Sequence, residues 1–114
     1  MTPIYKIATA EQWAAAQVSG GFEGAPVDLA DGFIHFSTAE QARETAAKHF
    51  AGQEALVLIA LDADAFGDKM VWEPSRGGQL FPHLYRPFLT SETLWARPLP
   101  MCADGSHDFD GLLP

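Results

Sequence analysis

The chain has 114 residues, of which 47% are hydrophobic, and 15 acidic residues against 7 lysines and arginines give a formal net charge of -8. This length and composition predict one ordered domain, and the negative charge makes nucleic-acid binding unlikely. The first residues lack the basic and then apolar pattern of a secretory signal. No apolar run approaches the roughly 20 residues of a membrane helix. We therefore expect a cytoplasmic protein with no membrane partner.

The first part of the chain predicts a strand, a helix and a loop. Residues 5–8 alternate in character, which indicates a short strand. Thr9 and Gln12 stand at the spacing of a capping box, so a helix is expected over residues 10–18. Residues 20–31 contain glycines, a proline and acids, and are expected to form a loop.

The next part predicts a second helix and a buried strand. Residues 32–35 are expected to form a brief strand, after which Ser37 or Thr38 caps a helix that ends near Gly52. Residues 56–61 are nearly all apolar, which is typical of a central strand buried on both faces.

Short extended segments dominate the rest of the chain. Strands are expected at residues 70–73 and 93–97, the second one closed by Pro98, with a short extended piece over residues 83–85.

Together these elements define a single α+β domain over residues 1–99. Strands and helices do not alternate regularly, so we expect a small mixed or antiparallel β-structure with two N-terminal helices. Residues 100–114 are acidic and contain glycine, and are expected to form a loosely ordered tail.

The first candidate site residues lie where the second strand meets its helix. His35 has apolar neighbours, which favours a neutral ring that can hold a ribose hydroxyl. A buried histidine that ties two strands together is the alternative. Ser37 and Thr38 begin the helix, where free N–H groups attract anions such as phosphate. Helix capping alone would also account for both hydroxyls.

The second group of candidates follows far downstream. Glu73 ends a strand, where a carboxylate can accept a proton or stabilise a developing cation, or can simply be solvated. His83 and Tyr85 are two residues apart in an extended segment and therefore share one face. Tyr85 can stack on a flat ring or pack in the core. Arg76 and Arg86 flank this group and could form a local basic pocket.

A metal site is not expected. His35, Glu73 and His83 can bind metals, but no two of them stand at the spacing of a metal motif. Cys102 is the single cysteine, so an internal disulfide is excluded. The His-x-Ser pattern of a two-histidine phosphodiesterase occurs once, at His35 and Ser37, and is not repeated at His83.

Three segments of the chain resemble a bacterial family catalogued as domain of unknown function 952. They are residues 32–38 (Gly-Phe-Ile-His-Phe-Ser-Thr), residues 71–74 (Val-Trp-Glu-Pro) and residues 80–85 (Leu-Phe-Pro-His-Leu-Tyr). That family is grouped with the ADP-ribosyltransferase-like fold, which clasps NAD. The resemblance implies that His35 bonds the nicotinamide-side ribose, with Ser37 and Thr38 beside it. It also implies that Tyr85 is a stacking aromatic and that Glu73 or His83 is the later polar residue of the site.

Three functions remain open, and only the first would make the protein an enzyme. The first is NAD-dependent ADP-ribosyl transfer or glycohydrolysis, with His35, Glu73 and His83 as catalytic candidates and Tyr85 stacked on nicotinamide. The second is a module that binds a nucleotide or another small anion without chemistry. The third is a protein-interaction domain, for which Trp72, Phe81 and Phe88 would be exposed together. A small-molecule ligand is the expected partner, and the oligomeric state is left open.

Overall fold

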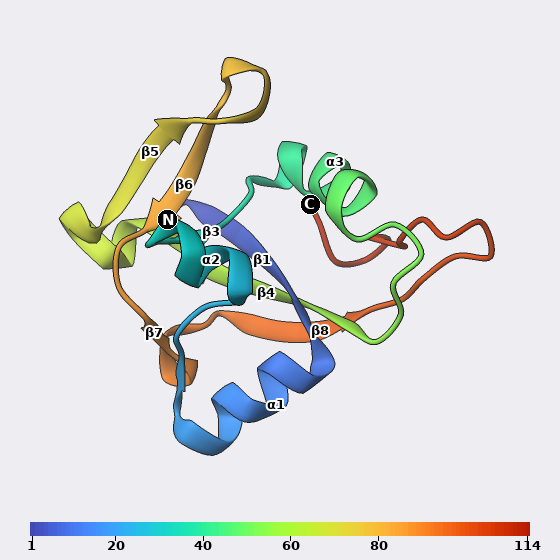
Figure 1. The fold of residues 1–114 in the computed structure, drawn as a ribbon, viewed down its shortest axis with the longest axis horizontal. Coiled ribbons are helices and arrows are strands. Elements are labelled where there is room, and N and C mark those ends of the chain that lie inside the picture. Colours follow the sequence, from blue (N-terminus) through green and yellow to red (C-terminus); the bar gives the residue numbers. More distant parts are fainter.

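The computed structural model describes the backbone of residues 1–114 and all side chains except that of Arg76, so the basic pocket expected around this arginine lies outside the described residues. Strand β4 (Leu56–Asp62) is the centre of the first sheet. It pairs antiparallel with β1 (Pro3–Thr9) on one side and with β8 (Trp95–Leu99) on the other (Figure 1).

Two helices form as the sequence predicts. Helix α1 (Ala10–Ser19) begins with a complete capping box, because Thr9 Oγ1 accepts from the backbone N–H of Gln12 and Gln12 Oε1 accepts from that of Thr9, both at 3.0 Å. Helix α3 (Ala39–His49) has Thr38 at its N-cap position. The prediction that a capping box starts the first helix is confirmed.

The sequence does not predict the helix between these two. Residues 20–31, expected to form a loop, contain β2 (Gly21–Phe22) and α2 (Pro26–Asp31). Proline is suited to the first position of a helix, where its missing N–H would have no partner anyway. Asp28 Oδ2 accepts from the backbone N–H of Ala25 at 2.7 Å and fixes this helix start. The described backbone therefore has three helices in its first half, and the expectation of two is wrong.

Strand β4 has a hydrophobic core on each face. Alternate side chains of a strand point to opposite faces. Val57, Ile59 and Leu61 belong to the core that includes α1, whereas Leu56 and Leu58 belong to the core that includes α3. The prediction of a central strand buried on both faces is confirmed.

A second antiparallel sheet carries most of the candidate site residues. Its order is β3 (Ile34–His35), then β6 (Leu80–Leu84), then β5 (Met70–Pro74). Strands β5 and β6 form a hairpin that extends away from the first sheet (Figure 1). The domain is thus a small, antiparallel α+β structure, as expected in its coarse outline.

The segment after β3 joins the two sheets. The backbone N–H of Phe36 donates to the Pro82 carbonyl at 3.0 Å, which continues the pairing with β6. Ser37 and Tyr5 then exchange two backbone hydrogen bonds of 2.8 and 2.9 Å, which attach the chain to β1. Residues 34–37 are therefore held by both sheets, and this position is fixed on two sides.

The remaining elements are short. Strand β7 (Phe88–Leu89) pairs with β2. Short segments of 3-10 helix are η1 (Ala63–Lys69), which is kinked at Gly67, η2 (Arg76–Gly78) and η3 (Thr90–Glu92). In the described part of the chain, no helix combines the length and apolar character needed to cross a bilayer.

Two expectations for the C-terminal part need correction. Pro98 lies within β8 rather than closing it, because β8 is an edge strand whose outer side needs no N–H donor. Residues 100–114 are expected to be loosely attached, but Phe109 is 4% exposed and belongs to the core beside α3. His107 Nε2 is also 2.8 Å from the Gln53 carbonyl oxygen. The structure thus packs this segment against the domain.

Candidate functional site

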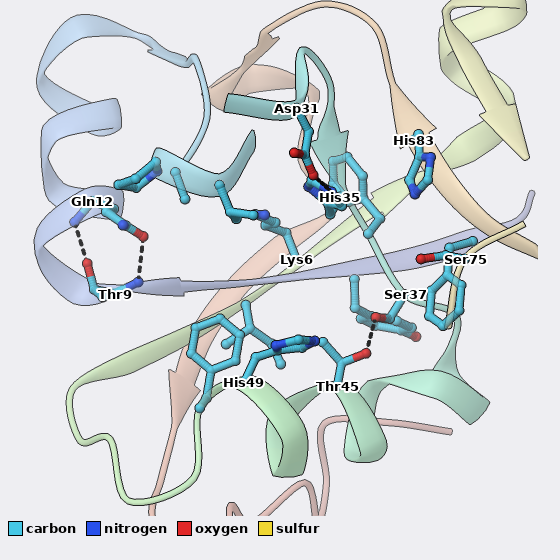
Figure 2. Close-up of a pocket in the computed structure, with 18 of the residues that line it drawn as sticks. Lys6, Thr9, Gln12, Asp31, His35, Ser37, Thr45, His49, Ser75 and His83 are labelled. Atoms are coloured by element: carbon cyan, nitrogen blue, oxygen red, sulfur yellow. Dashed lines mark hydrogen bonds and ion pairs between the residues drawn. The ribbon is translucent and has the colours of Figure 1, made fainter. Parts of the chain in front are cut away.

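A cavity of about 740 Å³ opens between the two sheets and α3 (Figure 2). Side chains from both groups of sequence candidates line it, among them His35, Ser37 and His83. In Figure 2 the two histidines lie at one end of the cavity, and His49 of α3 lies across it. The two distant polar segments of the sequence therefore contribute walls of the same cavity.

The floor of the cavity is the free edge of β1. The other edge of this strand is paired with β4, and on the cavity side Tyr5 is the residue for which the described part of the chain shows a bridge, to Ser37. Backbone groups of an antiparallel strand alternate in direction, so the N–H and C=O of Ile7 point to the same side as those of Tyr5. Ile7 also lines the cavity. Its backbone can therefore offer a donor and an acceptor to a ligand.

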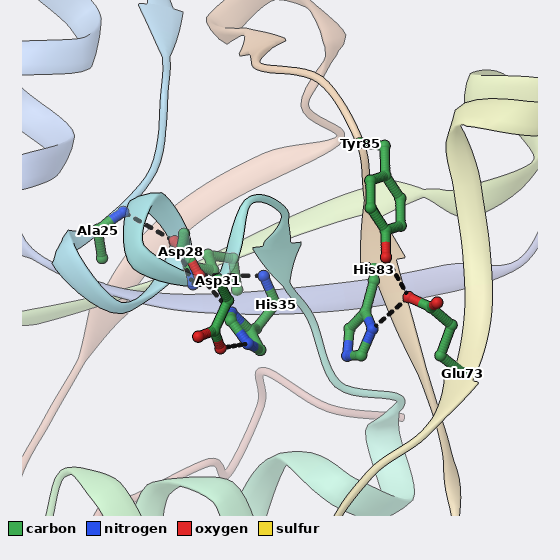
Figure 3. Close-up of polar contacts among 8 residues, drawn as sticks. Ala25, Asp28, Asp31, His35, Glu73, His83 and Tyr85 are labelled. Atoms are coloured by element: carbon green, nitrogen blue, oxygen red, sulfur yellow. Dashed lines mark hydrogen bonds and ion pairs between the residues drawn. The ribbon is translucent and has the colours of Figure 1, made fainter.

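His35 is fixed in place by Asp28 of α2. Asp28 Oδ1 is 2.7 Å from His35 Nδ1 and accepts from the His35 backbone N–H at 3.1 Å (Figure 3). Because an ionised carboxylate only accepts hydrogen bonds, Nδ1 carries a hydrogen. The other ring nitrogen, Nε2, lies against Asp31, and His35 and Asp31 both line the cavity.

Asp28 in turn forms a buried ion pair with Lys6. Lys6 Nζ is 3.0 Å from Asp28 Oδ1 and 2.9 Å from Oδ2, with side-chain exposures of 7% and 1%. Burial raises the pKa of Asp28, but the hydrogen bond from His35 and the charge and hydrogen bond of Lys6 outweigh it and lower the pKa to about 2. Burial lowers the pKa of Lys6, against the opposing effect of Asp28. The carboxylate stays ionised and holds His35 and Lys6 together.

A second carboxylate reaches the other side of the His35 ring. Asp31 Oδ2 is 2.9 Å from His35 Nε2, and the Asp31 side chain is 47% exposed. By the same reasoning Nε2 also carries a hydrogen in this arrangement, so both ring nitrogens of His35 donate to a carboxylate. Gly32 follows with a φ of 86°, which turns the chain sharply from α2 into β3. That turn places the last residue of α2 next to the ring of His35.

His83 forms a similar pair with Glu73 (Figure 3). His83 Nδ1 is 2.8 Å from Glu73 Oε1, and the Tyr85 hydroxyl donates to the same oxygen at 2.8 Å. The hydrogen bonds from His83 and Tyr85 lower the pKa of Glu73, and the bond to Glu73 raises the pKa of Tyr85. As predicted, His83 and Tyr85 share one face. His83 Nε2 has no recorded partner in the described part of the chain, and the ring lines the cavity.

Phe33 packs the two histidines together. Its ring is stacked on His83 with centroids 4.1 Å apart, and lies 4.6 Å from the His35 ring and 5.3 Å from that of Tyr85. His35 and His83 are paired across β3 and β6, with ring centroids 5.3 Å apart. An apolar ring thus shields one side of the pair from water.

The hydroxyl candidates have different surroundings. Ser37 is 4% exposed, lines the cavity, and its Oγ lies 2.8 Å from Thr45 Oγ1. Thr38 caps α3, with its backbone N–H donating to Gln41 Oε1 at 3.0 Å, and it is not among the described residues that line the cavity. A direct ligand contact is therefore supported for Ser37 and not for Thr38.

Glu73 and Tyr85 likewise lie behind the cavity wall. Neither side chain belongs to the described lining, and Tyr85 is 43% exposed. In this structure they orient His83 instead of facing a ligand. Arg86, the other expected cation, is engaged elsewhere, because it pairs with Glu92 at 2.8 Å and lies over the Phe66 ring at 4.7 Å.

Several site residues are absent from the sequence prediction. Lys6, Asp28, Asp31 and Phe33 all contact a candidate histidine or its carboxylate partner. The sequence does contain one signal for Asp28, because an aspartate two residues after Pro26 fits the first turn of a helix. Their proximity to His35 depends on the path of the chain, which the pattern alone does not fix.

This fold and cavity define a small α+β domain in which two histidines, each paired with a carboxylate, line one cavity. The chain belongs to the family described as "Protein of unknown function (DUF952)", whose sequence profile matches residues 7–96. The family resemblance inferred from the sequence is thereby confirmed. No match was found among the curated proteins.

Solved structures of one bacterial protein are similar to this chain. The X-ray crystal structure of protein CC0527 from Caulobacter crescentus is 54% identical, with a TM-score of 0.93 and 96% of each chain covered. A double mutant of that protein gives 53% identity, a TM-score of 0.93 and the same coverage. Its solution NMR structure is 54% identical, with a TM-score of 0.89, and covers 99% of this chain and 97% of that one.

Proposed function

We propose that this protein binds NAD or a closely related nucleotide in the cavity and cleaves its nicotinamide–ribose bond, in the cytoplasm where NAD is available. The observation that carries the proposal is the pairing of His35 with His83, whose ring centroids are 5.3 Å apart on one cavity wall. Two imidazoles at this distance can bind a sugar hydroxyl and move a proton on the same ligand.

His83 has the surroundings of a general base. Its Nδ1–H is held by the ionised Glu73, which leaves Nε2 as the acceptor on the cavity side. As the C–N bond breaks, nicotinamide leaves with the electron pair and water adds its oxygen to the ribose carbon. The proton of that water passes to His83 Nε2, and Glu73 stabilises the imidazolium that forms. With an acceptor hydroxyl in place of water, the same step is ADP-ribosyl transfer.

The remaining candidates receive roles that follow from their positions. His35, held by Asp28, donates from Nε2 to a ribose hydroxyl, and Ser37 lies beside it in the lining. Glu73 acts through His83, so we assign it as a positioning residue. The Tyr85 hydroxyl donates to the same carboxylate, so we assign Tyr85 to positioning Glu73 instead of stacking on nicotinamide.

We further propose that the fold is ADP-ribosyltransferase-like. Support comes from the two small sheets that meet at residues 34–37, with His35 at the junction and a cavity beside it. A fold of this kind does not by itself establish activity. The reaction therefore needs a direct test.

The test is incubation with NAD and chromatographic measurement of released nicotinamide. We expect turnover by the wild-type protein, loss of turnover in His83→Gln, and normal turnover in the control His107→Gln, which lies in the C-terminal segment. A thermal shift with NAD should accompany turnover. If neither nicotinamide release nor a thermal shift with NAD is observed, the proposal is overturned. A thermal shift without product would favour the non-catalytic binding module.

An interaction domain built on exposed aromatic residues has less support. Phe81 and Phe88 are 6% and 0% exposed, so with Trp72 at 38% they do not form a common exposed patch. We therefore do not propose this function.

A further inference from the structure

The Asp31 carboxylate lies beside the ligand-facing nitrogen of His35, at the rim of the cavity. Its Oδ2 is 2.9 Å from His35 Nε2, and its side chain is 47% exposed (Figure 3). For Asp31 Oδ1, the structure records no partner among the described residues. Asp31 also belongs to the cavity lining. The site therefore combines an imidazole N–H with an adjacent carboxylate oxygen that is still able to accept a hydrogen bond.

The charges around this position disfavour an anion. Lys6 is the one lysine or arginine in the described lining, and both oxygens of Asp28 hold its ammonium group, at 2.9 and 3.0 Å. A phosphate at His35 Nε2 would therefore meet the negative charge of Asp31 with no free ammonium or guanidinium beside it in the described lining. A neutral group that both donates and accepts hydrogen bonds fits better.

We propose that Asp31 and His35 together bind the vicinal diol of a ribose and select it against a deoxyribose or a phosphorylated sugar. One hydroxyl donates to the Asp31 carboxylate, and its neighbour accepts from His35 Nε2–H. A carboxylate is the usual protein partner of a free ribose hydroxyl, because it accepts strongly and repels a phosphate at the same position. This inference rests on the proposed function, since it names the part of the nucleotide that His35 holds.

The first arm of the test uses methyl β-D-ribofuranoside and its 2-deoxy analogue as probes. Ring resonances of protein labelled with ¹⁵N-histidine report binding at His35 directly. We expect the riboside to shift the His35 resonances at millimolar concentration, and the deoxy analogue to bind on the order of tenfold more weakly. Inorganic phosphate should leave these resonances unchanged. Equal binding of the two sugars, or a phosphate effect larger than that of the riboside, would overturn the inference.

The second arm uses Asp31→Asn, with Asp68→Asn as a matched control on an exposed position of η1. Asparagine keeps the shape of the side chain but removes its charge, so the riboside should bind on the order of tenfold more weakly. Phosphate should then begin to perturb His35. Asp68→Asn should behave like the wild-type protein. Unchanged riboside affinity in Asp31→Asn would contradict the assignment.

The two proposals fail in different ways. If the riboside perturbs His35 only when Asp31 is present, but NAD is neither bound nor cleaved, the diol site stands and the proposed reaction falls. If NAD is cleaved at the same rate by Asp31→Asn and the two sugars bind equally, the reaction stands and the diol site falls. Melting temperatures of the variants show that each of them is folded.

Discussion

His35 and His83 occupy directly paired positions on β3 and β6, and their rings meet nearly edge to face, with centroids 5.3 Å apart and an angle of 68°. Each ring is held through Nδ1 by a carboxylate from a different element, at 2.7 and 2.8 Å. Strand pairing thus fixes the two backbones, and the two carboxylates fix the two rings. This pre-organises both Nε2 atoms toward one ligand.

The partner of His83 provides the first prediction. Glu73→Gln keeps a hydrogen-bond acceptor but removes the charge that stabilises a protonated His83, so we expect nicotinamide release to fall about 100-fold. The fold should be retained because the side chain is 35% exposed. Glu54→Gln is the matched control and should leave the rate unchanged. A wild-type rate in Glu73→Gln would show that this carboxylate does not act through His83.

The tyrosine beside this pair provides the second prediction. Tyr85→Phe removes one of the two hydrogen bonds to Glu73 Oε1, while the bond from His83 remains. We therefore expect a smaller loss of nicotinamide release than in Glu73→Gln, about tenfold or less. Because the Tyr85 bond helps to lower the pKa of Glu73, this pKa should be higher in Tyr85→Phe, which ¹³C NMR of the Glu73 carboxyl group can follow. A loss as large as that of Glu73→Gln would instead indicate direct contact with the ligand.

The sequence predicts those parts of the site that local pattern determines. His35 and His83 stand out because they interrupt apolar segments, and the structure brings them to one cavity. The central strand over residues 56–61 is recognisable because a run of apolar residues without alternation indicates burial on both faces. Capping at Thr9 is equally local.

The parts that depend on the path of the chain are not predictable in this way. Helix α2 is only six residues long and lies between glycines, so its residues read as a loop. Asp28 and Asp31 belong to this helix and are therefore not predicted as site residues, although they contact His35. Lys6 reads as the outward residue of a strand, and only Asp28 makes its burial possible. The sequence thus identifies the two histidines of the site, but not the residues of α2 and β1 that hold His35 in place.

The buried ion pair provides the third prediction. Asp28→Asn leaves the Lys6 ammonium buried without a charged partner, which costs about 3–5 kcal/mol of unfolding free energy. Urea denaturation at neutral pH measures this loss. The double variant Lys6→Met with Asp28→Asn removes the unpaired charge and should recover part of the stability. A double variant less stable than Asp28→Asn would show that the ammonium group is stabilised by something other than Asp28.

The same carboxylate provides a prediction for acid. The pKa of Asp28 is lowered from 3.8 to about 2 in the folded protein, so the folded state binds its proton less readily than the unfolded chain does. The resulting stability, about 2 kcal/mol, is fully present above pH 3.8 and is lost as the pH falls toward about 2. Urea denaturation of the wild-type protein at a series of pH values that spans 3.8 and about 2 should show this loss of unfolding free energy. Asp28→Asn should lack that component of the pH dependence.

The C-terminal segment provides the last prediction. Phe109 is 4% exposed in the core beside α3, and the Arg43 guanidinium lies 5.6 Å from its ring centroid. Removing a buried aromatic ring costs about 3–5 kcal/mol, so Phe109→Ala should unfold at a clearly lower urea concentration. Val18→Ala is the control, since its side chain is 91% exposed and should change stability by less than about 0.5 kcal/mol. If Phe109→Ala were as stable as that control, the segment would contribute nothing to the core. A lowered midpoint would instead mean that the domain needs these residues to complete the second face of β4.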